Sequence, residues 1–168
     1  MKLLLMSDSH QNYSAVRDVV TRHRDEVDVF VHLGDGIREF LDVMKEMDCS
    51  NYYFIAGNHE DGTIYNQSPD YEIITIEGYR ILITHGDKYE NKLDLLGVAH
   101  IASMNGAEIA LCGHTHVAVD EMIHGVRVIN PGSLRYARDG AKRYAILDVD
   151  DDIYVAFIEY KKGENYES

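Results

Sequence analysis

The sequence has 168 residues, with 16 basic and 29 acidic side chains, which gives a net charge of −13. This length suits one domain with a single sizeable core. The negative charge excludes a protein dedicated to binding nucleic-acid backbones or anionic lipid, since either task requires a basic surface. We therefore expect neither a nucleic-acid polymer nor a membrane as partner. A small anionic substrate is compatible with this charge if a local positive centre, such as a metal ion, offsets it.

The start of the chain and its cysteines indicate a cytoplasmic protein. Only four apolar residues, Leu3 to Met6, precede a polar segment, and this run is too short for the core of a signal peptide. No apolar run reaches the length of a membrane span. Cys49 and Cys112 exclude a disulfide scaffold and a thiolate zinc site, so we expect two buried free thiols in a reducing compartment.

The sequence contains no linker, repeat or low-complexity tract, so residues 1–160 are predicted to form a single domain. Residues 161–168 are a polar tail and the one candidate for disorder. The 12 tyrosines could line an interface, for example in a homo-oligomer. Tyrosine is also an ordinary strand residue, and we favour that interpretation.

The first part of the chain predicts alternating strands and helices. Apolar runs that are typical of strands covered on both faces occur at residues 3–6, 29–31 and 52–55. Helical patterns lie between them, at residues 14–24, where Ser14 can act as the cap, and at residues 38–47. This alternation predicts a parallel sheet.

The second part of the chain is richer in strands. They are predicted at residues 72–76, 80–84, 109–112, 117–122, 126–129, 144–149 and 153–160. A helix is predicted over residues 93–104 and ends at Asn105-Gly106. This number of strands fits two sheets packed face to face with helices outside.

Polar clusters directly follow six of the predicted strands. They are Asp8-Ser9-His10, Gly34-Asp35, Gly57-Asn58-His59-Glu60, His85-Gly86-Asp87, Gly113-His114-Thr115-His116 and Asn130-Pro131-Gly132-Ser133. Ligands of α/β sheets bind at the carboxyl ends of the strands. If these six strand ends share one edge, their side chains form one site.

The residue types in these clusters suit a pair of metal ions. Imidazole nitrogens, carboxylate oxygens and an amide oxygen are supplied by Asp8, His10, Asp35, Asn58, His85, His114 and His116. An Asp-x-His pair in one turn can place both side chains on one ion, and His-x-His can serve two neighbouring ions. One carboxylate between the ions, with an oxygen for each, would bridge them.

Each candidate also has an ordinary structural interpretation. Asp8 could cap the first helix, Asp35 and Asn58 could be turn residues, and His85 and His114 could be core histidines. Taken together these interpretations fail, because five of the nine histidines fall in the strand-end clusters.

The remaining four histidines keep a structural interpretation; they are His23, His32, His100 and His124. His32 directly precedes Leu33-Gly34-Asp35 and could contact the site from behind its ligands. We favour an ordinary strand histidine at this position.

The motifs, in their order along the chain, resemble those of the calcineurin-like metallophosphoesterases. The family pattern is Asp-x-His, Gly-Asp, Gly-Asn-His-Glu/Asp, a histidine and Gly-His-x-His, and every element is present between Asp8 and His116. The short length and Asn130-Pro131-Gly132-Ser133 resemble the small single-domain phosphodiesterase subgroup. The resemblance implies an α/β fold, a two-sheet β-sandwich flanked by helices.

The resemblance also implies a role for each motif residue. One ion would be bound by Asp8, His10 and His116, and the other by Asn58, His85 and His114. Asp35 would bridge the ions, and His59 matches the family's catalytic histidine. We expect His59, Asn58 and Asp35 to act in catalysis.

Departures from the family pattern indicate which branch of the family the sequence resembles. After Gly34-Asp35 the chain continues with Gly36-Ile37-Arg38-Glu39, where the protein Ser/Thr phosphatases have Asp-Arg-Gly, which argues against that branch. Many members of the small subgroup have cysteine at the position of His59. Ala137-Arg138 stands where the subgroup often has Pro-Arg, and we expect Arg138 to contact substrate.

The predicted activity is hydrolysis of a phosphate ester, first of all a phosphodiester, by attack of a metal-bridging hydroxide. Two divalent ions, two carboxylates and a hydroxide leave a site of about +1, which attracts phosphate. Mixed N and O ligands favour Mn, Fe, Co, Ni or Zn, and the resemblance favours Mn. His59 can donate to a phosphate oxygen or protonate the leaving alkoxide.

Two alternatives remain open from the sequence. A phosphomonoesterase or a nucleotide pyrophosphohydrolase would use the same metal pair, because the rim of the site decides the substrate. A retromer subunit has the same fold and acts as a binding scaffold, but it departs from the family motifs. The intact ligand set of this chain argues against the scaffold.

Overall fold

The apolar run at the start of the chain forms a strand that is buried on both faces. In β1 (Lys2–Met6), Leu3 and Leu5 point into a hydrophobic cluster between two sheets. Leu4 and Met6 point to the opposite face, into a cluster beneath two helices. Successive side chains of a strand alternate between its faces, so a strand covered on both sides requires an unbroken apolar run.

The first sheet has five strands in the order β10-β9-β1-β2-β3. Besides β1 they are β2 (Val29–His32), β3 (Tyr52–Phe54), β9 (Arg143–Val149) and β10 (Ile153–Glu159). β1, β2 and β3 are parallel, as the first part of the sequence predicts. β9 and β10 pair antiparallel, so the sheet as a whole is mixed.

The second sheet has five strands in the order β4-β5-β6-β8-β7. They are β4 (Tyr71–Ile76), β5 (Tyr79–Thr84), β6 (Ile109–Leu111), β7 (Ala118–Ile123) and β8 (Val126–Pro131). β5, β6 and β8 are parallel, while β4 and β7 pair antiparallel at the two edges.

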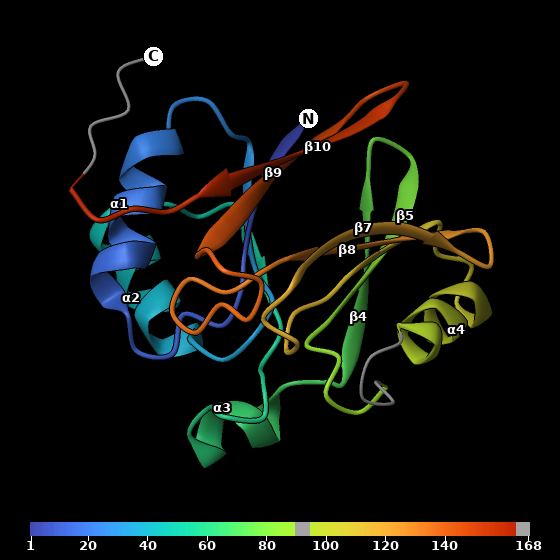
Figure 1. The fold of residues 1–168 in the computed structure, drawn as a ribbon, viewed down its shortest axis with the longest axis horizontal. Coiled ribbons are helices and arrows are strands. Elements are labelled where there is room, and N and C mark those ends of the chain that lie inside the picture. Colours follow the sequence, from blue (N-terminus) through green and yellow to red (C-terminus); the bar gives the residue numbers. More distant parts are fainter. Residues whose placement is uncertain (90–94, 164–168) are drawn as a thin grey trace.

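The two sheets pack face to face, with helices on their outer faces (Figure 1). The computed structural model describes residues 1–89 and 95–163. Helices α1 (Tyr13–His23) and α2 (Ile37–Glu46) cover the first sheet, and α4 (Leu96–Met104) covers the second. The predicted two-sheet α/β fold is confirmed.

The topology brings two sets of parallel strand ends to the same end of the sandwich. The turn after β1 carries Asp8 and His10, and it lies beside the turn after β6, which carries His116. The predicted single edge is therefore formed by two sheets, each contributing three of the six strand ends.

Several local predictions differ from the structure. The cap of α1 is Asn12, whose side chain accepts a hydrogen bond from the Ala15 N–H, and Ser14 lies inside the helix. The short helix α3 (Gly62–Gln67) is not predicted, since it has no buried residues and therefore no apolar face to detect. Cys112 is buried as expected, whereas Cys49 is partly exposed.

Some predictions lie partly outside the described residues. The predicted helix at 93–104 begins inside the undescribed segment 90–94, and α4 accounts for its later part. Residues 164–168 of the predicted polar tail are also outside the description, and 161–163 are exposed. The single domain over residues 1–160 stays a prediction. In the described parts of the chain, no helix is long and apolar enough to cross a bilayer.

The cap of α1 leads to a stability prediction. Asn12→Ala removes the acceptor for the Ala15 N–H and a contact to the Leu134 carbonyl. We expect Asn12→Ala to lower the free energy of unfolding by about 1 kcal/mol, as is typical of the loss of a helix cap. Ser14→Ala, at an exposed site, should change it by ~0.5 kcal/mol or less. Urea denaturation of both variants measures this, and a larger loss in Ser14→Ala would identify the wrong cap.

Candidate metal centre

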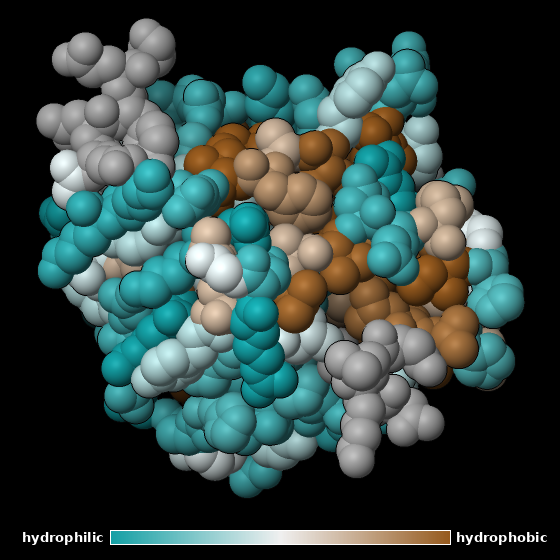
Figure 2. Space-filling model, in the orientation of Figure 1, coloured by the Kyte–Doolittle hydropathy of each residue, from teal (hydrophilic) through white to brown (hydrophobic). Residues whose placement is uncertain are grey.

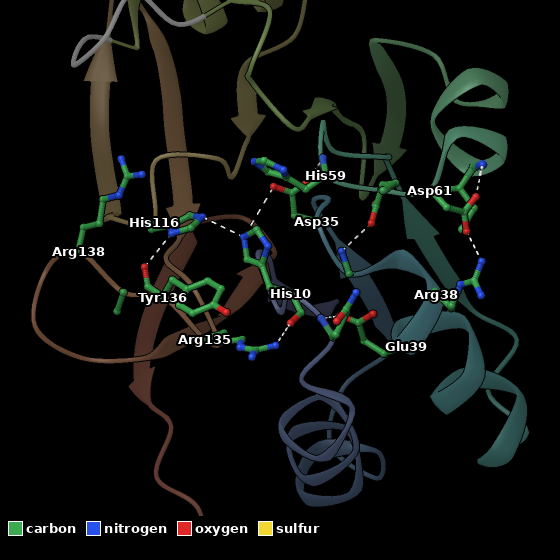
Figure 3. A pocket seen from close by; sticks show the side chains of 15 residues that line it. His10, Asp35, Arg38, Glu39, His59, Asp61, His116, Arg135, Tyr136 and Arg138 are labelled. Atoms are coloured by element: carbon green, nitrogen blue, oxygen red, sulfur yellow. Dashed lines mark hydrogen bonds and ion pairs between the residues drawn. The ribbon is translucent and has the colours of Figure 1, made fainter.

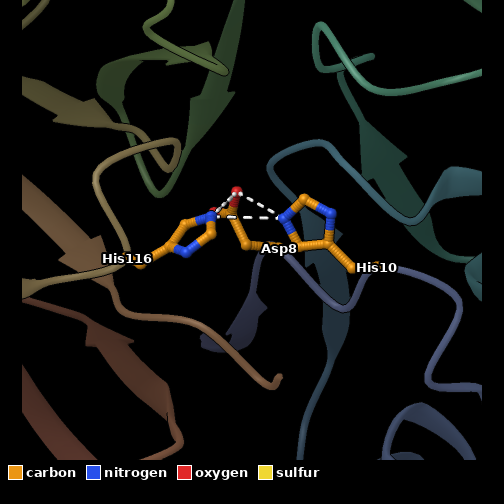
Figure 4. A group of neighbouring side chains, drawn as sticks. All are labelled: Asp8, His10 and His116. Atoms are coloured by element: carbon orange, nitrogen blue, oxygen red, sulfur yellow. Dashed lines mark hydrogen bonds and ion pairs between the residues drawn. The ribbon is translucent and has the colours of Figure 1, made fainter. Parts of the chain in front are cut away.

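Two groups of side chains bring possible metal ligands together at the shared end of the sheets. In each group the ligand atoms all lie within 4.8 Å of one another. The first group consists of Asp8, His10 and His116 (Figure 4), and the second of Asp35, His85 and His114. Six of the seven residues predicted to bind metal thus lie in these two groups. Five of them lie in the set that the family resemblance implies, and Asp35, the expected bridge, lies in the second group.

The first group is a tight triangle of one carboxylate and two imidazoles. His116 Nε2 lies 3.1 Å from Asp8 Oδ1 and 3.2 Å from His10 Nε2. His10 Nε2 lies 3.7 Å from the same Asp8 oxygen. The three atoms therefore converge on a space of the size that one ion occupies between its ligands.

The second group is extended by the amide of Asn58. His85 Nε2 lies 3.2 Å from Asp35 Oδ2 and 3.1 Å from Asn58 Oδ1. The ring of His114 meets the ring of His85 edge to face, with 5.1 Å between the centroids. The seventh predicted ligand therefore lies beside the second group, and the structure brings all seven residues into one site.

Asp35 lies between the two groups. Its Oδ2 is 3.2 Å from His85 Nε2 in the second group and 3.7 Å from His10 Nε2 in the first. Its Oδ1 instead accepts a hydrogen bond from the His59 N–H at 2.8 Å. A single carboxylate oxygen thus faces both groups, where the sequence interpretation expects one oxygen for each.

The buried carboxylates fit a metal-binding role because each has one oxygen that the protein leaves without a hydrogen bond. Within residues 1–89 and 95–163, such buried oxygens include Asp8 Oδ1 and Asp35 Oδ2. The other Asp8 oxygen accepts bonds from the Ser7 hydroxyl and the His114 N–H. A buried carboxylate oxygen without a donor is unfavourable unless a cation faces it, so these donors fit divalent ions.

Two histidines are oriented by their outer nitrogens. Nδ1 of His85 lies 2.7 Å from the Leu33 carbonyl, and Nδ1 of His116 lies 2.7 Å from the Tyr136 carbonyl. A carbonyl oxygen can only accept, so Nδ1 carries the proton in both rings. In the neutral form of each ring, Nε2 then has a free lone pair directed into the site, which is the arrangement that metal-binding histidines use.

The acidic and basic groups of the site stabilise one another's charges. Burial alone would raise the pKa of Asp8, but His10 and His116 outweigh it and hold that pKa well below its usual range. Burial likewise opposes protonation of His85, but Asp35 outweighs it and raises the pKa of His85 to about 9. The same carboxylate charges would stabilise a bound divalent cation, and binding of the cation would release the protons of the imidazole rings.

Five of the candidate ligands adopt left-handed backbone conformations that side chains seldom favour. The φ angles are 52° at Asp8, 41° at His10, 57° at Asp35, 71° at His114 and 61° at His116. Such conformations persist only where the surrounding structure enforces them, and they cluster at functional sites. The local strain therefore indicates that these turns are shaped to direct their side chains into the site.

Glycines allow the backbone to approach the ligands closely. A Cβ atom on Gly57 would lie 2.1 Å from Asp35 Oδ1, and one on Gly34 would lie 2.4 Å from His85 Nδ1. Either contact is impossible, so each position requires glycine. These are the glycines of the Gly-Asn-His-Glu and Gly-Asp motifs.

A buried hydrogen-bonded chain behind the ligands includes His32. Its Nδ1 accepts from the Gly34 N–H at 3.1 Å, and its Nε2 lies 2.9 Å from Ser9 Oγ, which donates to Glu39 Oε1 at 2.8 Å. Burial lowers the pKa of His32 to about 3, which keeps the ring neutral. The favoured interpretation as an ordinary strand histidine is therefore incomplete, because His32 links the turns after β1 and β2.

Sequence reasoning missed several other supporting residues. Asn130 donates from Nδ2 to the Gly113 carbonyl, and Ser133 donates to the Asp8 carbonyl at 2.8 Å. Glu60 accepts bonds from the N–H groups of Gly36 and Ile37, and so caps α2. Asn130, Ser133 and Glu60 belong to the strand-end clusters, which was the available signal.

A cleft of about 1260 Å³ borders the site, and His10, Asp35 and His116 are among its lining residues (Figure 3). His59 is exposed in it, and its ring centroid lies 5.7 Å from that of His10. Arg138 lies on the rim, where its N–H donates to the His116 carbonyl at 3.0 Å. The predicted catalytic histidine and substrate residue thus share the cleft with three of the candidate ligands, and their roles stay predictions.

Comparisons with known proteins identify the family. The model of the calcineurin-like phosphoesterase superfamily domain matches residues 1–152. "Probable metallophosphoesterase YsnB" of Bacillus subtilis is 33% identical over 153 residues, which cover 90% of this chain and 86% of that protein. A phosphodiesterase of Methanocaldococcus jannaschii is 30% identical over 169 residues, which cover 92% of this chain and 96% of that protein.

Solved structures show the same fold. A predicted phosphoesterase of Streptococcus pneumoniae matches with a TM-score of 0.78 and 25% identity, covering 94% of this chain and 88% of that one. Vps29 of Entamoeba histolytica, a single mutant, matches with a TM-score of 0.74 and 16% identity, covering 96% and 100%, and shows the fold alone. On the family match and these relatives, the chain belongs to the calcineurin-like phosphoesterase superfamily.

Proposed function

We propose that the protein is a phosphodiesterase that hydrolyses a small phosphate ester with the help of two divalent metal ions. The observation that carries the proposal is the pair of adjacent ligand groups, with an oxygen of Asp35 facing both, at the edge of a cleft. One ion would be held by Asp8, His10 and His116, and the other by Asn58, His85 and His114, with Asp35 Oδ2 between them.

The donor set supports a transition metal. Imidazole nitrogens and carboxylate or amide oxygens without a thiolate suit Mn, Fe, Co, Ni and Zn better than Mg or Ca. Mn is our first choice, and Fe, Zn, Ni and Co are the alternatives. The ions would make the site locally positive within a protein whose net charge is −13, and so attract an anionic phosphate.

When bound, such a pair of ions supplies a clamp for phosphate oxygens and lowers the pKa of a water between them. His59 would deliver a proton to the leaving group. Its N–H bond to Asp35 Oδ1 fixes its backbone next to the shared carboxylate, while its ring stays exposed in the cleft. Arg138 on the rim would contact the phosphate or its substituent.

The alternatives concern the substrate and the presence of chemistry. A phosphomonoesterase or a nucleotide pyrophosphohydrolase would use the same ligand groups. A binding scaffold would not need the strained ligand turns or the unpaired Asp8 and Asp35 oxygens. Turnover of bis(4-nitrophenyl) phosphate against 4-nitrophenyl phosphate separates a phosphodiesterase from a phosphomonoesterase, and hydrolysis of a nucleoside triphosphate tests the pyrophosphohydrolase. The proposal expects the diester to be preferred, and turnover of none of the three would favour the scaffold.

The remaining proposals concern location and assembly. We propose a cytoplasmic location, because both cysteines are free thiols. We propose a small phosphate ester as partner and neither nucleic-acid polymers nor membranes, on the grounds of the net charge. A homo-oligomer would use the hydrophobic side chains on the face of β7, β8, β9 and β10 in Figure 2, which contrasts with the more hydrophilic surface over α1 and α2.

Metal removal is the most direct test of the centre. We expect two transition-metal ions per chain by elemental analysis, loss of diester hydrolysis in a chelator, and recovery with Mn²⁺. Thermal melting should show a higher Tm with the ions bound, since they bind the folded state. Full activity in a chelator, with no metal bound, would contradict the mechanism.

The position of Asp35 predicts that it is the most sensitive ligand. Asp35→Asn keeps the shape but removes the charge that faces both groups, so occupancy of both ions should fall. Diester turnover should fall at least about 100-fold, beyond the 10- to 100-fold typical of residues that only orient ligands. Asp120→Asn on β7, which breaks an ion pair with Arg127, is the control and should change neither quantity. Retention of both ions in Asp35→Asn would show that Asp35 is not the bridge.

The exposed ring of His59 predicts a loss that depends on the leaving group. His59→Ala should keep both ions and lower kcat about 10²–10⁴-fold for diesters with a poor alkoxide leaving group, but little for an activated aryl ester. KM should change less than kcat, since the interaction is made in the transition state. The measurement is kcat over diesters of graded leaving-group pKa, with His124→Ala as control. Equal losses across the series would remove the acid role, and lost metal would make His59 a ligand.

A further inference from the structure

The segment after β8 is fastened to the candidate metal centre through its backbone. The Ser133 hydroxyl donates to the Asp8 carbonyl and accepts from the N–H of Tyr136 at 2.9 Å. The Tyr136 carbonyl accepts from His116 Nδ1, and the Arg138 N–H donates to the His116 carbonyl. The side chains of this segment therefore lie at fixed positions relative to the ligand groups.

The ring of Tyr136 lies beside the first ligand group. It is nearly parallel to the ring of His116, with 6.5 Å between the centroids and 19° between the planes, and its centroid is 5.2 Å from that of His10. The Arg135 guanidinium lies 4.9 Å from the centre of the tyrosine ring, and it also donates to the His10 carbonyl. These contacts hold a ring that is still 52% exposed in the cleft.

The cleft has two walls with different chemistry. Figure 3 shows Arg135, Tyr136 and Arg138 on one side of the His10–Asp35 pair, and Arg38 with Asp61 on the other. The chain from His59 to Ile64 leads into this second wall. A phosphodiester carries two ester groups that point away from the phosphorus in different directions, so a bound diester would place one group near each wall.

We infer that Tyr136 binds the retained ester group of the substrate by stacking, and that this group is a flat aromatic one. The inference rests on the proposed function, in which His59 serves the leaving group and leaves the opposite wall for the retained group. The neighbours of Tyr136 already hold its exposed ring, so few rotatable bonds of this side chain remain to be fixed when a ligand binds. The flat apolar face of the ring can therefore stack on an aromatic group at little loss of conformational entropy.

The test uses two diesters with the same leaving group. Bis(4-nitrophenyl) phosphate retains an aromatic group, and methyl 4-nitrophenyl phosphate retains a methyl group. In Tyr136→Ala we expect kcat/KM for the aromatic diester to fall roughly ten-fold, the scale of one aromatic stacking contact, with a change of less than about two-fold for the methyl diester. Tyr136→Phe should keep the wild-type preference. Tyr154→Ala, which removes a 67% exposed tyrosine from β10, should change neither value.

A binding measurement separates this inference from the proposed function. Calorimetry of the Mn-loaded protein with phenylphosphonate and methylphosphonate reads recognition without turnover. Weaker binding of phenylphosphonate alone in Tyr136→Ala supports the inference, even if neither diester is hydrolysed and the proposed function fails. Equal losses for the aromatic and methyl ligands, in turnover and in binding, would overturn it and leave Tyr136 as a support for His116.

Discussion

The burial of two carboxylates, Asp8 and Asp35, at one site is the constraint on which the site depends. Asp8 and Asp35 each have one oxygen held by protein donors and one that accepts no hydrogen bond. A buried negative charge is unfavourable unless positive groups surround it. Imidazoles approach both carboxylates in this structure, and divalent ions would satisfy them more fully. The turns that carry these two carboxylates are held by the hydrogen-bonded residues His32, Ser9 and Glu39. The helix-capping residues Asn12 and Glu60 support the same turns.

Local strain accompanies this constraint. The turns that carry Asp8, His10, Asp35, His114 and His116 all place a non-glycine residue at positive φ. The turn after β1 directs the side chains of Asp8 and His10, two positions apart, into the same ligand group. The unfavourable conformations are offset by packing elsewhere, chiefly in the cluster between the sheets, where Leu3, Leu5 and Ile83 are fully buried.

Much of this arrangement could be predicted from sequence because the relevant signals are local. Apolar runs mark the strands, and each ligand follows a strand within a few residues, so the sheet edge and the candidate ligands follow from the order of the chain. What escaped prediction depends on contacts between distant residues. Ser9 and Glu39 are 30 positions apart, and the placement of Tyr136 beside His116 depends on a bond that spans 20. Whether one oxygen of Asp35 or both face the two groups is likewise set by tertiary packing, since the His59 N–H occupies the other oxygen.

Each ligand group takes side chains from both sheets, and this has a consequence for assembly. Asp8 and His10 follow β1 in the first sheet, and His116, which is 106 positions beyond His10, follows β6 in the second. An ion held by these three residues would link the first sheet to the second. Neither group can be complete until the sheets have docked, so high-affinity binding of an ion there would require the docked sandwich. Ions held at this place would oppose any motion that slides one sheet across the other.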